Sequence, residues 1–99
     1  MITIVATLKA QPGKEAELQA ALTEMVGQVK EKEAGKVTSY TLHTKDDDPS
    51  TFLFYEQYRD ADAFAAHGTT DHMKALGAKL GGVLAGRPEI GRYTQIAAI

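Results

Sequence analysis

The segment from Thr51 to Arg59 constrains the fold most, because it alternates with a period of two and is largely apolar or aromatic on both faces. One face of the predicted strand carries Phe52, Phe54, Glu56 and Tyr58. The other face carries Leu53, Tyr55 and Gln57. Apolar surface is stable only when it is removed from water. The sheet that contains this strand therefore needs cover on both sides.

Further strands and one long helix are predicted before this segment. Residues 2–9 alternate between two faces and predict a strand, and the β-branched run 37–44 predicts another, which the polar turn 45–50 joins to the aromatic strand. Between the strands 2–9 and 37–44, an amphipathic helix is expected from Lys14 to about Glu33. Its apolar face consists of Leu18, Leu22, Met25 and Val29.

After the aromatic strand the pattern predicts a helix in two pieces. Asp60 can cap a short helix through Ala66, and a second helix starts near Thr69 or Thr70. The expected apolar face of the second helix is Met73, Leu76, Leu80, Val83 and Leu84. Pro88 prevents its continuation, and residues 90–99 predict a last strand. The order β-α-β-β-α-β, with a split second helix, is that of an α+β, ferredoxin-like plait with one antiparallel four-stranded sheet.

Size and composition limit the partners of the chain. Its 99 residues predict a single domain, 1–99, and the 11 basic residues are scattered and outnumbered by 13 acidic ones, which argues against nucleic acid or an anionic membrane as a partner. No run approaches the roughly 18 apolar residues of a membrane span. The absence of cysteine excludes disulfides, thiolate catalysis and iron–sulfur clusters, and it fits the cytoplasmic location that we expect.

The open face of the predicted sheet has a consequence for assembly. In a ferredoxin-like plait the helices cover one face, whereas the first and third strands carry apolar side chains on both. A second copy that stacks sheet on sheet is the simplest cover for the other face. We therefore expect a homodimer.

Two histidines, His67 and His72, are the strongest candidates for chemistry near neutral pH. His67 shares a helix face with Phe64, so it points inward if Phe64 anchors that helix in the core. His72 lies in the first turn of the next helix, at the edge of its apolar face. Either ring could act as a general base on a bound molecule, or it could simply hydrogen-bond to the nearby backbone.

Glu56 is a third candidate, because a carboxylate on an apolar strand face must be paired, hydrogen-bonded or raised in pKa. A structural pairing with Arg59, Arg87 or Arg92 and a catalytic role are both open. Tyrosines such as Tyr40 could line a cavity or only pack in the core. No metal is expected, since the two histidines lack a His-x-x-x-His or His-Glu motif, and the chain has no phosphate loop or flavin fingerprint. No cofactor is therefore predicted.

Three stretches of the chain resemble the antibiotic biosynthesis monooxygenase family. They are the strand end Tyr55-Glu56-Gln57-Tyr58, the pair Ala63-Phe64, and the run from His67 to Lys74, which reads His-Gly-Thr-Thr-Asp-His-Met-Lys. The start, with Gln11-Pro12-Gly13-Lys14-Glu15 after a strand, is also similar. The resemblance implies a dimeric α/β barrel built from ferredoxin-like subunits. The family includes cofactor-free quinol and polyketide monooxygenases, haem-degrading enzymes and an isomerase. The haem branch is disfavoured, because its members resemble one another in a pocket tryptophan that this chain lacks. The chain also departs from the family pattern at Met73, which replaces the usual aromatic residue after the second histidine.

The leading hypothesis is a cofactor-independent monooxygenase that oxidises a small dihydroxyaromatic or quinol with dioxygen. His67 or His72 would remove a phenolic proton, and Glu56 would orient a histidine or a substrate hydroxyl. The residues expected to contact the substrate are Tyr40, Tyr55, Tyr58, Phe64 and Met73. Two alternatives stay open. One is a proton-shuttling isomerase of a small carbonyl compound, with or without a phosphate group, and the other is a noncatalytic dimeric module that binds a small ligand.

Overall fold

The computed structural model describes residues 1–99, and its elements follow the predicted β-α-β-β-α-β order with a divided second helix. In chain order the elements are β1 (Ile2–Lys9), α1 (Glu15–Lys32), β2 (Val37–Lys45), β3 (Asp48–Tyr58), α2 (Ala61–Gly68), α3 (Asp71–Leu80) and β4 (Glu89–Thr94). The four strands form one sheet in the order β2-β3-β1-β4, with every neighbouring pair antiparallel. The predicted α+β ferredoxin-like fold is confirmed.

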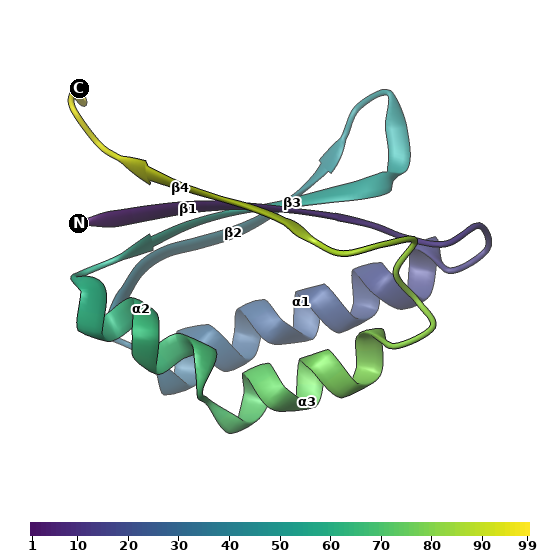
Figure 1. Ribbon diagram of the computed structural model, residues 1–99, viewed down its shortest axis with the longest axis horizontal. Helices are drawn as coiled ribbons and strands as arrows, with labels where there is room; N and C mark the ends of the chain where they lie inside the picture. The colour runs from purple at the N-terminus through teal and green to yellow at the C-terminus, as the bar shows by residue number, and fades with distance from the viewer.

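The three helices lie together on one face of the sheet, and the other face has no helix over it (Figure 1). The central strands β1 and β3 alternate as predicted, with Phe52, Phe54 and Tyr58 buried beneath the helices. On the opposite face Leu53 is only half-buried and Tyr55 is 37% exposed. This chain alone therefore leaves the second face of its aromatic strand uncovered.

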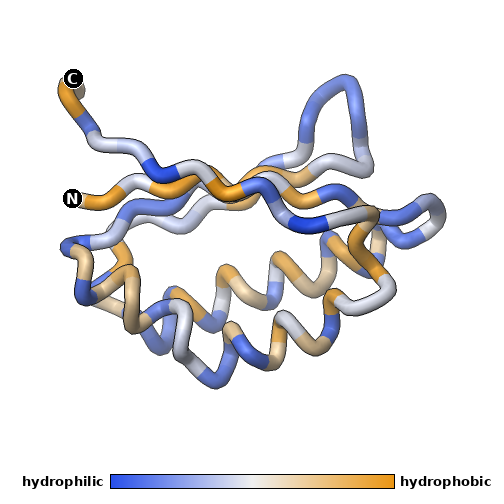
Figure 2. The backbone as a smooth tube through the Cα atoms, viewed as in Figure 1, coloured by the Kyte–Doolittle hydropathy of each residue, from blue (hydrophilic) through white to orange (hydrophobic).

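Helix α1 packs on the sheet through the four residues of its predicted apolar face, Leu18, Leu22, Met25 and Val29, all of which are buried. They form one core with Ala6 and Leu8 of β1 and with the phenylalanines of β3. Figure 2 shows the same arrangement as hydrophobic stretches along the strands and helices, with the turn between β2 and β3 hydrophilic. No helix of the chain is both long enough and apolar enough to cross a membrane.

Helix α3 is shorter than its apolar pattern suggests. It ends at Leu80, and Gly82 adopts a positive φ of 82° in the turn that follows, a conformation that glycine tolerates. Val83 and Leu84 were both predicted on the helix, but Val83 lies in this turn and Leu84 pairs with Ala10 just after it. Val83 is buried all the same, because its carbonyl accepts a hydrogen bond from the Gln11 amide and ties the segment to the end of β1.

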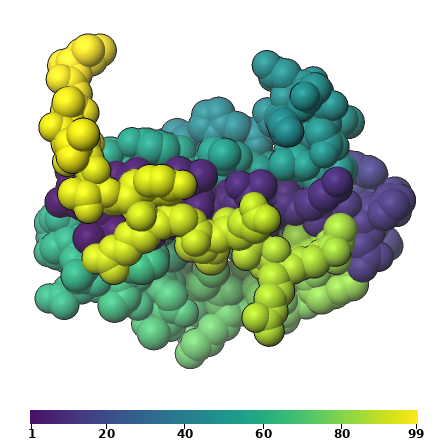
Figure 3. All heavy atoms as spheres, turned by 45° about the horizontal axis from the view of Figure 1, so that its top comes forward, coloured from purple at the N-terminus to yellow at the C-terminus, as the bar shows by residue number.

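The ends of two strands also differ from the prediction. Strand β3 begins at Asp48 rather than Thr51, because the Asp48 carboxylate accepts hydrogen bonds from Ser50 and Thr51 and allows a tighter turn. Strand β4 ends at Thr94, opposite Ile2, because β1 offers no residue further along with which to pair. The residues after Thr94 project from the body of the molecule, with Ile96 96% exposed (Figure 3).

Candidate active site

The short helix α2 places His67 inside the protein. The helix begins after Asp60, whose carboxylate accepts a hydrogen bond from the Ala63 amide at 2.8 Å, and it ends at Gly68. His67 lies in its last turn and is 4% exposed. The predicted inward orientation of His67 is therefore what the structure has.

Helix α3 starts almost at once and positions His72. Thr70 caps it, because the threonine hydroxyl accepts a hydrogen bond from the Met73 amide at 3.2 Å. The Thr70 hydroxyl also donates to the His67 carbonyl at 3.0 Å, so one side chain joins the end of α2 to the start of α3. This junction fixes the two histidines relative to each other.

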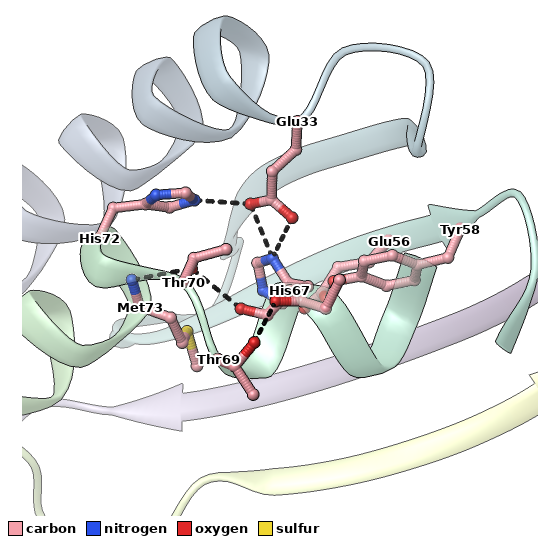
Figure 4. A network of polar contacts seen from close by, with 9 residues as sticks. Glu33, Glu56, Tyr58, His67, Thr69, Thr70, His72 and Met73 are labelled. Carbon is pink, nitrogen blue, oxygen red and sulfur yellow. Dashed lines mark hydrogen bonds and ion pairs between the residues drawn. The ribbon is translucent and has the colours of Figure 1, made fainter. Parts of the chain in front are cut away.

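Glu33 connects the two imidazole rings and was not predicted as a site residue. It caps the C-terminal end of α1, and only 4% of it is exposed. Its carboxylate lies 2.9 and 3.0 Å from Nδ1 of His67 and 2.6 Å from Nε2 of His72 (Figure 4). The sequence held a signal for it, since Glu33 follows Val29 by four residues and so continues the buried face of α1 with a carboxylate.

An apolar cavity of about 380 Å³ lies between the sheet and helices α2 and α3. Among the predicted site residues, those that line it are Tyr40, Glu56, Phe64, His67 and Met73. Its volume falls within the range of about 300–1,000 Å³ that is usual for small-molecule sites. The cavity combines an apolar wall with three titratable side chains, those of Tyr40, Glu56 and His67.

The remaining predicted site residues lie elsewhere. Tyr55 is on the open face of β3, because successive strand residues point to opposite faces, so it does not line this cavity. Tyr58 is fully buried behind the wall, with its ring centroid 5.1 Å from that of Phe64 and 5.3 Å from that of His67. His72 does not line the cavity but a separate groove between α1 and α3. The two histidines therefore meet at Glu33 and not in one chamber.

Within the chain, Glu56 has a tyrosine partner in place of the suggested arginine. The Tyr58 hydroxyl donates a hydrogen bond to the Glu56 carboxylate. Arg59 instead contacts Asp60 and the Gly35 carbonyl. Arg92 lies over the ring of Phe64, 5.9 Å from its centroid. Glu56 is thus a buried carboxyl group that no positive charge neutralises within the chain.

This environment alters the acidity of three neighbouring groups. Burial raises the pKa of Glu56 to about 7, the hydrogen bond from Tyr58 lowers it, and the charge of Glu33 raises it. Burial is also the main reason why the pKa values of Tyr40 and Tyr58 lie well above their ordinary 10, with the Glu56 charge adding to the effect. Both phenols therefore stay protonated and can donate hydrogen bonds. No group of three or more His, Asp or Glu side chains is arranged to hold a metal ion.

The raised pKa of Glu56 predicts a pH-dependent stability. The folded protein keeps the Glu56 proton up to about pH 7, whereas the unfolded chain loses it near 4.5, so unfolding releases a proton between these values. The contribution is fully present below pH 4.5 and is lost as the pH rises through 7, on the order of 2–3 kcal/mol in all. Urea denaturation between pH 4.5 and 8 should show wild type losing this much relative to Glu56→Gln, which keeps an acceptor for Tyr58. Parallel curves for the two proteins would contradict the assignment.

The fold and the site together define a class: a small α+β protein in which one helical layer and an antiparallel sheet enclose an apolar cavity, with a buried carboxylate–histidine pair at its edge. The chain belongs to the antibiotic biosynthesis monooxygenase family, whose model matches residues 1–79. The resemblance seen in the sequence is thereby confirmed.

Solved structures agree with this membership. One, from Caulobacter crescentus CB15, whose own designation as an antibiotic biosynthesis monooxygenase is provisional, is 35% identical with a TM-score of 0.89, over 97% of this chain and 90% of that one. PA3566 from Pseudomonas aeruginosa is 28% identical with a TM-score of 0.89, over 97% and 94% of the two chains. Rv0793 from Mycobacterium tuberculosis, at 20% identity and a TM-score of 0.88 over 98% and 96%, shares the fold. Among curated proteins, none matches the chain significantly.

Proposed function

We propose that this protein is a cofactor-independent monooxygenase that acts on a small dihydroxyaromatic or quinol. The observation that carries the proposal is the position of His67, which lines the apolar cavity while a buried carboxylate holds its Nδ1. A carboxylate at Nδ1 fixes the ring and stabilises the imidazolium that forms when Nε2 accepts a proton. Nε2 of His67 has no hydrogen-bond partner within the chain and is not among its fully buried polar atoms. It is therefore free to meet a substrate hydroxyl.

The proposed reaction converts a dihydroxyaromatic and O₂ into a hydroxyquinone and water. Nε2 of His67 takes one phenolic proton, and the electron-rich anion forms a bond from a ring carbon to dioxygen. The imidazolium returns its proton to the peroxide. The O–O bond then breaks as the same ring carbon loses its hydrogen as a proton, and the outer oxygen leaves as water. The substrate loses four electrons and dioxygen gains four, so no other reductant is needed.

The other residues of the cavity have distinct proposed roles. Phe64 and Met73 would form the walls, and Tyr40 would donate a hydrogen bond to a substrate oxygen, since its phenol stays protonated. Glu56 would bind a substrate hydroxyl. The role of orienting a histidine, which Glu56 was expected to share, fits Glu33 better, because Glu33 is the carboxylate in contact with His67.

The lining of the cavity favours this substrate class over a phosphorylated carbonyl compound. Eleven of its 15 lining residues are hydrophobic, and none is a lysine or arginine. A phosphate would need several such donors and would lie beside the Glu56 carboxyl group. An uncharged aromatic ring would instead gain from burial against apolar side chains.

Oxygen uptake by the purified, chelator-treated protein tests the proposal. With a small quinol as substrate we expect consumption of one O₂ for each hydroxyquinone formed, above the rate of autoxidation without protein. Turnover without oxygen consumption under anaerobic conditions would support the isomerase instead. Binding of the quinol without any turnover would leave only the binding module.

We also propose that the protein is a homodimer in which a second copy covers the open face of the sheet. Leu53 and Tyr55 of β3 lie on that face, together with Val5 of β1. Light scattering should give twice the chain mass of 10.7 kDa. Leu53→Asp, which places a charge on the face, should shift the protein towards monomer, whereas Thr23→Asp on the exposed side of α1 should not. A monomeric wild type would refute the proposal.

A further inference from the structure

A second hollow lies on the far side of Glu33 from the cavity. It is a groove of about 230 Å³ between α1 and α3, and His72 is part of its wall. The apolar cavity includes His67 but not His72, and the groove includes His72 but not His67. Glu33, the residue between the two rings, lines neither. Leu76 lies between the two hollows as a shared apolar wall, whereas His67, Glu33 and His72 join one wall to the other through polar side chains.

The connection consists of hydrogen-bonded contacts without a gap. His67 Nδ1 lies 2.9 Å from Oε2 of Glu33, and the same oxygen lies 2.6 Å from Nε2 of His72. The three side chains are between 4% and 7% exposed, so bulk water does not reach the contacts. The outer nitrogen of each ring, Nε2 of His67 and Nδ1 of His72, has no partner within the chain and is not sealed off. Each end of the series is thus open to one hollow.

We infer that His72 and Glu33 form a proton path between the groove and His67, an inference that relies on the proposed function for its purpose in turnover. When His67 Nε2 accepts a proton in the cavity, its Nδ1 proton passes to Glu33. At the same time the proton shared between Oε2 of Glu33 and Nε2 of His72 moves onto Nε2, and His72, which carries its second proton on Nδ1, releases that proton to water in the groove. The reverse movement returns a proton when the peroxide needs one. Because the net reaction consumes and releases no protons, one outward and one inward transfer reset both rings.

The surroundings of Glu33 and His72 favour a proton path over a purely structural role for these hydrogen bonds. Both rings contact the same oxygen of Glu33, Oε2, so one carboxylate atom adjoins both nitrogens between which a proton would move. In the groove wall beside His72, Oε1 of Gln28 is a buried acceptor without a partner in the chain, the kind of atom that usually binds an ordered water.

Charged and titratable groups face the path from each element around it. On the groove side they are Glu24 and Lys32 on α1, and Asp71 and Lys79 on α3. On the cavity side they are Tyr40 of β2 and Glu56 and Tyr58 of β3. Lys79 is paired with Glu24 at 2.9 Å, so it does not compete for Glu33.

Exchange of the His67 Nδ1 proton with water, measured by NMR, tests the path without any substrate. His72→Gln keeps a side chain that can hydrogen-bond to Glu33 but cannot pass a proton on, so we expect exchange to slow about tenfold or more. Asp71→Asn, in the same groove wall, is the matched control and should exchange like wild type. Equal exchange rates in wild type and His72→Gln would overturn the inference whether or not the protein turns over a quinol.

Turnover provides the second arm. In weak buffer, His72→Gln should lower kcat by about tenfold while KM stays within about twofold, since the cavity is unchanged. Free imidazole should restore kcat in His72→Ala, where the groove is enlarged. An unchanged kcat in His72→Gln would exclude the path from the reaction. If wild type fails to oxidise any quinol, the proposed function fails, and the exchange measurement alone still decides whether the path exists.

Discussion

His67→Ala is expected to lower quinol-dependent oxygen uptake by a factor of about 10² to 10⁴, the usual contribution of a positioned general base. The substitution removes the only imidazole that lines the cavity and leaves Glu33 without one of its two imidazole partners. The effect should fall on kcat more than on KM, because the apolar walls that hold the ring are unchanged. Steady-state oxygen-electrode measurements on metal-free protein would provide both constants.

The third histidine offers a matched control for this experiment. His43 lies on β2, is exposed, and contacts neither Glu33 nor the cavity. His43→Ala should therefore retain wild-type uptake. Full uptake in the double variant His67→Ala, His72→Ala would eliminate histidine-assisted deprotonation altogether.

Glu33→Ala is expected to reduce the free energy of unfolding by about 2–5 kcal/mol at neutral pH. Two buried imidazole rings lose the carboxyl group to which they hydrogen-bond, at about 1–3 kcal/mol for each unsatisfied group, and a small cavity remains. Since small domains are stable by only about 5–15 kcal/mol, this is a large fraction of the total. Urea denaturation followed by far-ultraviolet circular dichroism would measure the change.

Comparison with two other variants separates this network from helix effects. Glu31→Ala removes an exposed carboxylate two residues earlier on α1 and should change stability by less than about 0.5 kcal/mol. Glu33→Gln keeps an oxygen that can accept one ring N–H, so it should lose less than Glu33→Ala. A Glu33→Ala protein as stable as Glu31→Ala would show that the contacts to the two histidines contribute nothing to folding.

Much of the fold follows from local patterns. The alternation of Phe52, Phe54 and Tyr58 with Leu53 and Tyr55 predicted both faces of β3, because side-chain direction in a strand has a fixed period. The apolar spacing along α1 likewise predicted its buried face. The predicted ends of α3 and β4 were less accurate. A glycine turn decides where α3 ends, and the length of the neighbouring strand decides where β4 ends.

The sequence predicted only part of the candidate site. His67 was recognised as a titratable ring that shares a helix face with Phe64, and Glu56 was recognised because it interrupts an apolar strand face. The partner of Glu56 was not predicted. Tyr58, two residues along the same strand face, and several distant arginines could all have paired with Glu56, and only the distances in the folded protein decide between them. Tyr55 was grouped with the substrate wall although its position in the strand already placed it on the other face.

The sequence by itself determined which residues face inward, since the periods of helix and strand are properties of the backbone. Only the tertiary structure decided that Glu33 meets His67 and His72, and that the two rings open into different hollows. The carboxylate lies 34 positions from one histidine and 39 from the other. No local period relates groups that far apart, so their contact depends on how the end of α1 packs against the junction of α2 and α3.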